Sequence, residues 1–227
     1  LQRRGRRFKS YFAHSFFLLM PAPAQVLDLS KAIRCLRRSP YLAPLIAQHG
    51  KPTFRPTRNA FRALTESIIY QQLSGKAAAT IFDRFLDIFP NRRFPAPARL
   101  LAVPLPRLRA AGLSTQKATY VLDLAVKFCD GTIQPRRFGQ MSDEEISQHL
   151  IQVKGIGQWT ADMFLMFGLN RPDVLPVGDL GIRNGFKKLY DLSDMPAADE
   201  MITLAEPWRP YRTVASWYLW RAAEDKL

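Results

Sequence analysis

The segment from Val153 to Ala161, VKGIGQWTA, constrains the fold of this chain more than any other. Its two glycines lie one residue apart, between a short apolar lead-in and an apolar run at helical spacing. Glycine adopts backbone angles that other residues resist, and it lets a second backbone approach closely. The pattern therefore predicts a tight hairpin that opens a helix, whose first amides lack internal partners and suit an anion such as a phosphate.

An isolated acid, Asp179, follows beyond the end of the helix that the hairpin opens. Its simplest interpretation is an N-cap for a helix that begins at Leu180. A carboxylate near an anion-binding hairpin also suits a protein that holds a DNA backbone and acts on a nucleotide. The two interpretations are compatible, and the residues alone leave both open.

The composition favours a folded protein with a polyanionic partner. The chain has 227 residues, 47% of them hydrophobic, which argues against a disordered chain. Its formal net charge of +14 favours nucleic acid, with an acidic membrane surface as the alternative. Two distant cysteines and three scattered histidines predict neither a disulfide framework nor a His/Cys metal site.

Residues 1–20 differ from the rest of the chain. Basic residues are concentrated in this stretch, and a short apolar run follows them. The segment resembles a poor secretory signal or an organelle transit peptide, and its apolar run is too short to span a bilayer. We expect a basic extension that is disordered or artefactual, with the folded part beginning near Met20.

The remainder predicts an all-α fold. Apolar residues recur at three- and four-residue intervals, and prolines separate the stretches that show this pattern. Ser142 and the acids that follow it are typical of a helix start. The expected helices span 26–38, 58–72, 76–89, 115–129, 142–152, 157–168, 180–190 and 211–223.

Five stretches resemble the helix-hairpin-helix DNA glycosylases, and specifically their alkylation-repair branch, the 3-methyladenine DNA glycosylase II type. They occur in the family's order, within roughly residues 26–224. The bacterial enzyme of this branch carries an N-terminal β domain without a counterpart here, so the chain resembles a compact form. The stretches are 67–78 (SIIYQQLSGKAA), 112–118 (GLSTQKA), 153–161, 176–183 (PVGDLGIR) and 208–212 (WRPYR).

The resemblance implies two helical subdomains with an active-site cleft between them. Residues 61–171, which include the helix-hairpin-helix, would form the central subdomain. Residues 21–60 and 172–227 would form the terminal one. Asp179 would be the catalytic carboxylate at the cleft, acting on a nucleotide flipped out of the duplex.

The same resemblance implies a base pocket made by Trp159, Trp220 and Met163. For each tryptophan a core position is the alternative interpretation. Trp159 stands where glycosylases with lyase activity carry a lysine, and an indole forms no Schiff base. The resemblance therefore implies a monofunctional enzyme, which releases the base and leaves the abasic strand uncut.

Two segments are expected to bind DNA. The loop Gln72-Leu73-Ser74 would enter the duplex, with Leu73 as the wedge that fills the gap; a core leucine is the alternative. The hairpin would bind phosphate through Lys154, Gly155, Ile156, Gly157 and Thr160. Other basic side chains are either phosphate contacts or solvated surface charges: Lys76, Lys117, Arg183 and Arg212.

The resemblance implies no required cofactor. Without a four-cysteine cluster, no iron–sulfur cluster is expected. The family hairpin often holds a Na⁺ or K⁺ ion through backbone carbonyls, which would be those of Ile151, Val153 and Ile156.

The expected function is base excision repair. The enzyme would hydrolyse the N-glycosidic bond of alkylated purines such as 3-methyladenine and 7-methylguanine. Its partner would be double-stranded DNA with damaged bases, without a membrane, and the protein would be a monomer. It would lie in a bacterial nucleoid or a eukaryotic nucleus, with organelle targeting by residues 1–20 as an alternative. Two other functions compete: a glycosylase of the same fold for deaminated or oxidised bases, and a non-catalytic DNA-binding protein.

Overall fold

The computed structural model describes residues 27–225, and all regular elements in that range are helical. The predicted all-α class is confirmed. The predicted extension 1–20 lies outside the described residues. No helix within residues 27–225 is long and apolar enough to cross a bilayer.

Within residues 27–225, twelve α-helices follow one another, together with four short 3₁₀- or π-helical turns. The helices are α2 (Leu29–Leu36), α3 (Leu42–His49), α4 (Ala60–Tyr70), α5 (Gly75–Asp87), α6 (Pro97–Leu101), α7 (Leu105–Ala110), α8 (Thr115–Cys129), α9 (Asp143–Leu150), α10 (Gln158–Met163), α11 (Leu180–Leu189), α12 (Ala198–Leu204) and α13 (Arg212–Glu224). The turns are η1 (Pro90–Arg92), η2 (Pro135–Gln140), the π-helical η3 (Phe164–Gly168) and η4 (Glu206–Trp208).

Local capping signals explain where several helices begin. The predicted start at Ser142 is a capping box: its side chain accepts from the Glu145 amide, and Glu145 accepts from the Ser142 amide. Asp179 is the N-cap of α11, as predicted, and its side chain accepts from the Ile182 amide at 2.9 Å. The predicted helix 157–168 is α10, which continues directly into the π-helical turn η3.

Four helices were not predicted: α3, α6, α7 and α12. Each has eight residues or fewer, which is too short for a convincing apolar period. Prolines mark the first turns of α6 and α7, where the missing N–H costs no intrahelical hydrogen bond. The sequence prediction treated these prolines only as separators between helices.

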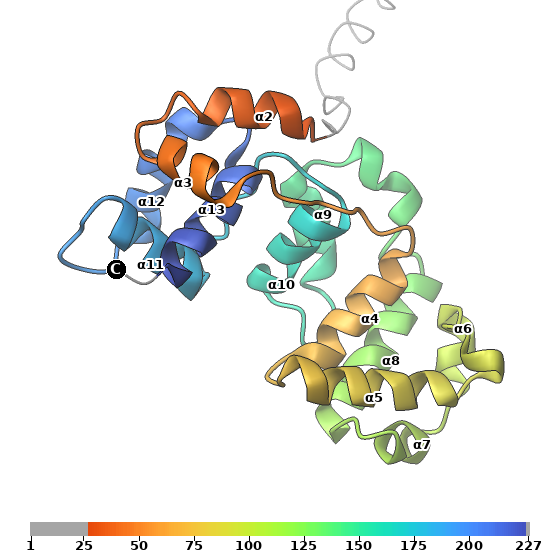
Figure 1. The fold of residues 1–227 in the computed structure, drawn as a ribbon. Coiled ribbons are helices and arrows are strands. Elements are labelled where there is room, and N and C mark those ends of the chain that lie inside the picture. Colours follow the sequence, from red (N-terminus) through yellow and green to blue (C-terminus); the bar gives the residue numbers. More distant parts are fainter. Residues whose placement is uncertain (1–26, 226–227) are drawn as a thin grey trace, which may run out of the picture.

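The buried residues form two separate apolar cores. One lies among helices α4 to α10 and runs from Phe61 to Val174. The other joins α2 and α3 to α11, α12 and α13. In Figure 1 the two groups of helices lie on opposite sides, and α9 and α10 are the helices of the first group that lie nearest the second. The two cores support the predicted division into 61–171 and 21–60 plus 172–227, which itself stays a prediction.

The two cores meet at Trp220 and at the segment that follows η3. Trp220 packs against both cores from α13. Residues 169–179 lead from the central helices into α11, and Asp179 is the last residue of this linker. The predicted catalytic acid therefore lies at the junction between the two cores.

Candidate active site and DNA-binding face

Three hydrogen bonds hold the half-buried carboxylate of Asp179. Its Oδ1 accepts from the indole N–H of Trp220 at 2.9 Å and from the Ile182 amide at 2.9 Å. Its Oδ2 accepts from the indole N–H of Trp159 at 2.6 Å. The structure thus brings three of the predicted site residues together, although they come from the linker, α10 and α13.

All three donors to Asp179 are uncharged. Among residues 27–225, no cationic side chain forms an ion pair with this carboxylate. Each carboxylate oxygen accepts up to two hydrogen bonds, so Oδ2 keeps acceptor capacity beyond the bond from Trp159. The arrangement orients the carboxylate and leaves its negative charge available to a nearby cation.

Gly181 makes room for this arrangement. A Cβ at this position would lie 2.7 Å from Cδ1 of Trp220 and 3.1 Å from Oδ1 of Asp179. The ring of Trp220 therefore occupies the space of the missing side chain. A glycine two residues after Asp179 allows the first turn of α11 to pack against the indole.

Stacked aromatic rings extend from Trp220. Phe167 stacks on Trp220 with ring centroids 5.9 Å apart, and Phe54 stacks on Phe167 at 5.7 Å. A mainly apolar pocket of about 290 Å³ lies beside Phe167, and Met163 and Thr160 line it too. The pocket thus adjoins the Asp179 centre through Phe167, while Asp179 itself is not among its lining residues.

Trp159 is about half exposed, at 48%. The core interpretation of this residue is therefore wrong. Trp159, Met163 and Phe167 follow one another at four-residue spacing, which places them on one face of α10 and its π-helical extension. An exposed indole on this face, bonded to Asp179, leaves the carboxylate bordered by aromatic surface.

The predicted hairpin joins α9 to α10. Gly155 has a φ of +83°, and a Cβ there would overlap the ring of Tyr120 on α8. Its carbonyl accepts from Nε2 of Gln71 at 2.8 Å, while the Lys154 amide donates to Asp123 at 2.9 Å. These contacts fix the hairpin against α8 and against the loop that follows α4.

Gly157 plays a different part from Gly155. It is the N-cap of α10, with ordinary backbone angles and no side-chain cap. An added Cβ would have no heavy atom within 4 Å. The space in front of the first α10 amides is therefore open to another molecule's backbone.

The loop between α4 and α5 presents an apolar tip. Gln72 has a φ of +57°, and Leu73 beside it is 39% exposed. The alternative of a core leucine is therefore wrong. Ser74 caps α5 by accepting from the Ala77 amide. Since Gln71 bonds the hairpin, the loop and the hairpin belong to one continuous face.

This face lies in a segment with known relatives. The model of the HhH-GPD superfamily of base excision DNA repair proteins matches residues 65–210, which include the loop, the hairpin and Asp179. The match covers more than half of the chain. This chain belongs to the HhH-GPD superfamily.

Curated members of the superfamily resemble most of the chain. DNA-3-methyladenine glycosylase 1 of Schizosaccharomyces pombe is 37% identical over 177 residues, 75% of this chain and 78% of the relative. YfjP of Bacillus subtilis is 33% identical over 188 residues, 81% of this chain. The chain spans 66% of the length of YfjP.

Solved HhH-GPD structures have the same fold. A DNA-3-methyladenine glycosidase of Bacillus halodurans aligns with a TM-score of 0.78 and 34% identity, over 88% of this chain and 91% of the other. The Schizosaccharomyces pombe enzyme Mag1, solved with abasic DNA, aligns with a TM-score of 0.73 and 35% identity, over 86% and 97%. The predicted relationship to the 3-methyladenine branch is confirmed.

Several basic residues that were candidates for phosphate contacts form hydrogen bonds within the protein instead. Nζ of Lys117 donates to the carbonyls of Ile69 and Gln71 at 2.7 and 2.6 Å, and burial lowers the pKa of this ammonium. Nε of Arg183 donates to the Pro196 carbonyl at 3.3 Å. Arg212 bonds to the linker, as described below. Lys117 therefore caps the C-terminal end of α4, a role that spacing alone did not reveal.

Two hairpin residues expected to bind phosphate are buried. Ile156 and Thr160 are each 4% exposed, so their side chains pack inward. Any contact of theirs with phosphate runs through the backbone. Lys154, Lys76 and Gly157 are exposed.

The sequence reasoning missed Phe54 and Phe167. Phe167 carried a signal, because it continues the four-residue spacing of Trp159 and Met163. Phe54 carried none, since it lies in an irregular segment far from Phe167 in the sequence. Trp217, the other tryptophan of α13, packs edge-on against Tyr218 and under the guanidinium of Arg221.

The backbone carbonyl oxygens of the hairpin are ligands of the kind that a hard monovalent cation binds. The Val153 carbonyl already accepts from the Ile156 amide at 3.0 Å, and a carbonyl has a second lone pair. Ile151 and Ile156 lie in the same turn. The cation stays a prediction, and no step of the reaction below depends on it.

Proposed function

We propose that this protein is a base excision repair DNA glycosylase that hydrolyses the N-glycosidic bond of alkylated purines. The observation that carries the proposal is the carboxylate of Asp179, held only by neutral donors beside an aromatic pocket. The similarity to named 3-methyladenine glycosylases supports the substrate class.

Asp179 acts on the sugar. Breaking the glycosidic bond builds positive charge on the deoxyribose, and a fixed negative charge stabilises it. The same carboxylate orients the attacking water or removes its proton. Because its donors orient Asp179 without neutralising it, the full charge acts where the cation develops.

The aromatic rings bind the flipped base. An alkylated purine carries a positive charge, which favours stacking on an electron-rich ring. Trp159, Trp220 and Phe167 offer such rings beside Asp179. A cationic purine is also a good leaving group, so the site needs little acid catalysis.

Double-stranded DNA is the proposed partner. The exposed tip Leu73 would fill the space of the flipped nucleotide, and the open backbone at Gly157 would meet a phosphate. The solved relative Mag1, in complex with abasic DNA, supports DNA as the partner. The chain's formal charge of +14 favours a polyanion.

Trp159 makes the reaction purely hydrolytic. A Schiff base needs an amine at the sugar, and an indole supplies none. The protein would therefore release the base and leave an intact abasic strand.

A panel of duplexes, each with one defined lesion, tests the proposal. The expected result is release of 3-methyladenine and 7-methylguanine, scored by chromatography of the free base. Release restricted to uracil or 8-oxoguanine would move the protein to another lesion class. Tight DNA binding without release of any base would make it a non-catalytic binder.

A further inference from the structure

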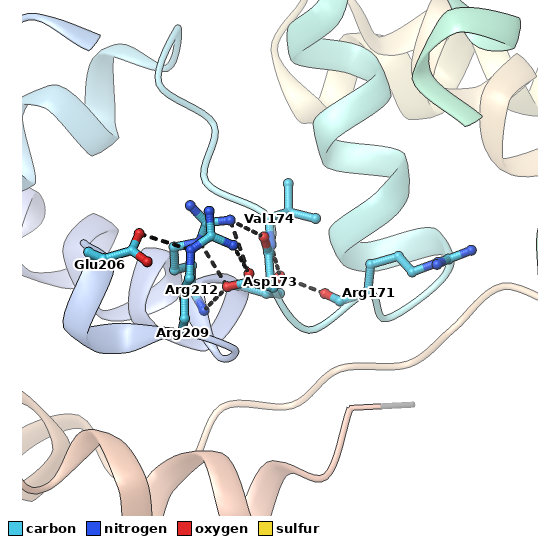
Figure 2. Close-up of polar contacts among 7 residues, drawn as sticks. Arg171, Asp173, Val174, Glu206, Arg209 and Arg212 are labelled. Carbon is cyan, nitrogen blue, oxygen red and sulfur yellow. Dashed lines mark hydrogen bonds and ion pairs between the residues drawn. The ribbon is translucent and has the colours of Figure 1, made fainter. Parts of the chain in front are cut away.

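The linker before α11 is bonded to the first turn of α13 by side chains without a role in the site described above. We call this group the junction clamp; Figure 2 labels its residues Arg171, Asp173, Arg209 and Arg212. It includes both arginines of the WRPYR stretch, Arg209 and Arg212, of which Arg212 was expected to be a phosphate contact or a solvated surface charge. The clamp consists of Arg171, Asp173, Arg209, Arg212 and Thr213.

Arg212 binds Asp173 through one edge of its guanidinium, in a bidentate fork made by Nε and Nη2. Nε donates to Oδ1 at 2.8 Å, and Nη2 donates to Oδ2 and to the Asp173 carbonyl, each at 3.0 Å. Nη1 of Arg209 adds a bond to Oδ2 at 2.6 Å. A fork of this kind fixes direction as well as distance. With only 11% of the Arg212 side chain exposed, the geometry is held firmly.

Thr213 holds the backbone on both sides of Asp173. Its hydroxyl donates to the Arg171 carbonyl at 2.6 Å and accepts from the Val174 amide at 3.0 Å. Its own amide donates to the Pro172 carbonyl at 3.0 Å. Thr213 is fully buried. The linker therefore has little freedom to slide along α13.

The clamp also reaches the central core. The guanidinium of Arg171 donates to the carbonyls of Phe138 and Met141 and pairs with Asp143 at 3.1 Å. The same short segment is thus bonded to α9 on one side and to α13 on the other. Its position fixes how the two cores meet.

The linker and α13 meet a second time at the candidate active site. Trp220 lies about 12 Å along α13 from Arg212, at 1.5 Å per residue. There it donates to Asp179, which ends the linker that contains Asp173. Beyond Asp179, Gly185 of α11 packs directly on the backbone of Leu219 in α13. Linker and helix are therefore bonded at both ends.

We propose that the junction clamp positions Asp179: Arg212 and Thr213 hold α13 at the height where Trp220 meets the carboxylate. Neither residue touches the reacting atoms. The inference rests on the proposed role of Asp179. A clamp that only stabilised the fold would leave the geometry of the carboxylate unchanged when its fork is loosened.

The first test is Arg212→Lys, which keeps the charge and loses the fork. Arg221→Lys is the matched control, because it makes the same change on the same helix outside the clamp. Single-turnover base release should fall about tenfold or more in Arg212→Lys, whereas the dissociation constant for an abasic-site duplex should change less than about twofold. The indole ¹⁵N–¹H signal of Trp220, assigned with Trp220→Phe, should shift, and that of Trp217 should not.

Two results would overturn the proposal. One is a folded Arg212→Lys protein whose rate lies within about twofold of wild type. The other is a lost rate with an unmoved Trp220 signal. If the wild-type protein released no alkylated base, the proposed function would be wrong. The shift of the Trp220 signal in Arg212→Lys would then be the test of whether the clamp positions Asp179.

A second pair of variants covers the case in which Arg212→Lys does not fold. Thr213→Val keeps the shape and removes the hydroxyl, and it should lower the rate and shift the Trp220 signal. Thr213→Ser restores the hydroxyl and should restore both. Equal behaviour of the two variants would count against the clamp.

Discussion

Two carboxylates on one linker, Asp173 and Asp179, are held in opposite ways. Asp173 accepts from two arginines, at distances between 2.6 and 3.4 Å, and its charge is compensated. Asp179 accepts from two indoles and one amide, all neutral. Both carboxylates are fixed in orientation, and only Asp179 keeps an uncompensated charge.

The two sets of donors suit two different roles for a carboxylate, a structural one and a reactive one. An arginine fork gives a strong, directional link, but it also neutralises the acid. Indole N–H groups give direction while leaving the charge available for a cation that develops beside them. The same residue type therefore serves as a joint at Asp173 and as the proposed reactive group at Asp179.

Removing the charge at Asp179 should have the largest effect. Asp179→Asn changes little volume, so DNA affinity should stay the same or improve, while single-turnover base release should fall by at least about a hundredfold, roughly 2.7 kcal/mol. Asp194→Asn, an exposed site, is the control. A variant that kept more than about a tenth of the wild-type rate would show that Asp179 is not the reacting group.

The same change at Asp173 should lower the stability of the fold. Asp173→Asn leaves the little-exposed guanidinium of Arg212 without its counter-charge, and the free energy of unfolding should fall by about 2–4 kcal/mol. Chemical denaturation measures this loss. An unchanged stability would mean that the clamp is not a structural joint at all.

A third acid, Asp162, is a largely buried carboxylate without a cationic partner among residues 27–225, and its burial costs stability. It lines a pocket of about 330 Å³ at the junction, and burial raises its pKa to about 6 despite a hydrogen bond from Gln158. The ordinary value is 3.8, so the folded protein binds an extra proton between these values and loses stability as the pH rises through them.

Asp162→Asn removes this cost. The free energy of unfolding at pH 7 should rise by about 1–3 kcal/mol, since one pKa unit corresponds to about 1.4 kcal/mol. The gain should disappear near pH 4, where Asp162 is protonated in the folded protein. Urea denaturation at both pH values measures it, and an equal gain at both would contradict the assignment.

The smallest effect expected is on DNA binding. A carboxylate at Gly157 would repel a phosphate close to the α10 amides, so Gly157→Asp should weaken binding about tenfold to damaged and undamaged duplexes alike. Gly157→Asn is the matched control, because both residues are good N-caps. A loss confined to damaged DNA would argue against a phosphate contact there.

The sequence was informative where a feature is local. The capping box at Ser142, the N-cap at Asp179 and the sharp turn at Gly155 all follow from a few adjacent residues. The family resemblance placed Trp159 and Trp220 in the base pocket, and in the structure both donate a hydrogen bond to Asp179.

Contacts between distant segments were out of reach. No local pattern pairs Phe54 with Phe167, Lys117 with the end of α4, or Asp173 with Arg212. Each depends on how separate helices pack. The clamp in particular was invisible, because Arg212 is equally plausible as a phosphate contact when only its charge is known.

The central claim is that a carboxylate, rather than a lysine, carries the reaction. The most direct measurement uses wild-type protein and a duplex with one 7-methylguanine, with and without borohydride. The account predicts free 7-methylguanine, an abasic strand that breaks only in hot alkali, and no covalent adduct. A borohydride-dependent protein–DNA adduct that disappears in Lys154→Ala would contradict it and identify the hairpin lysine as the nucleophile.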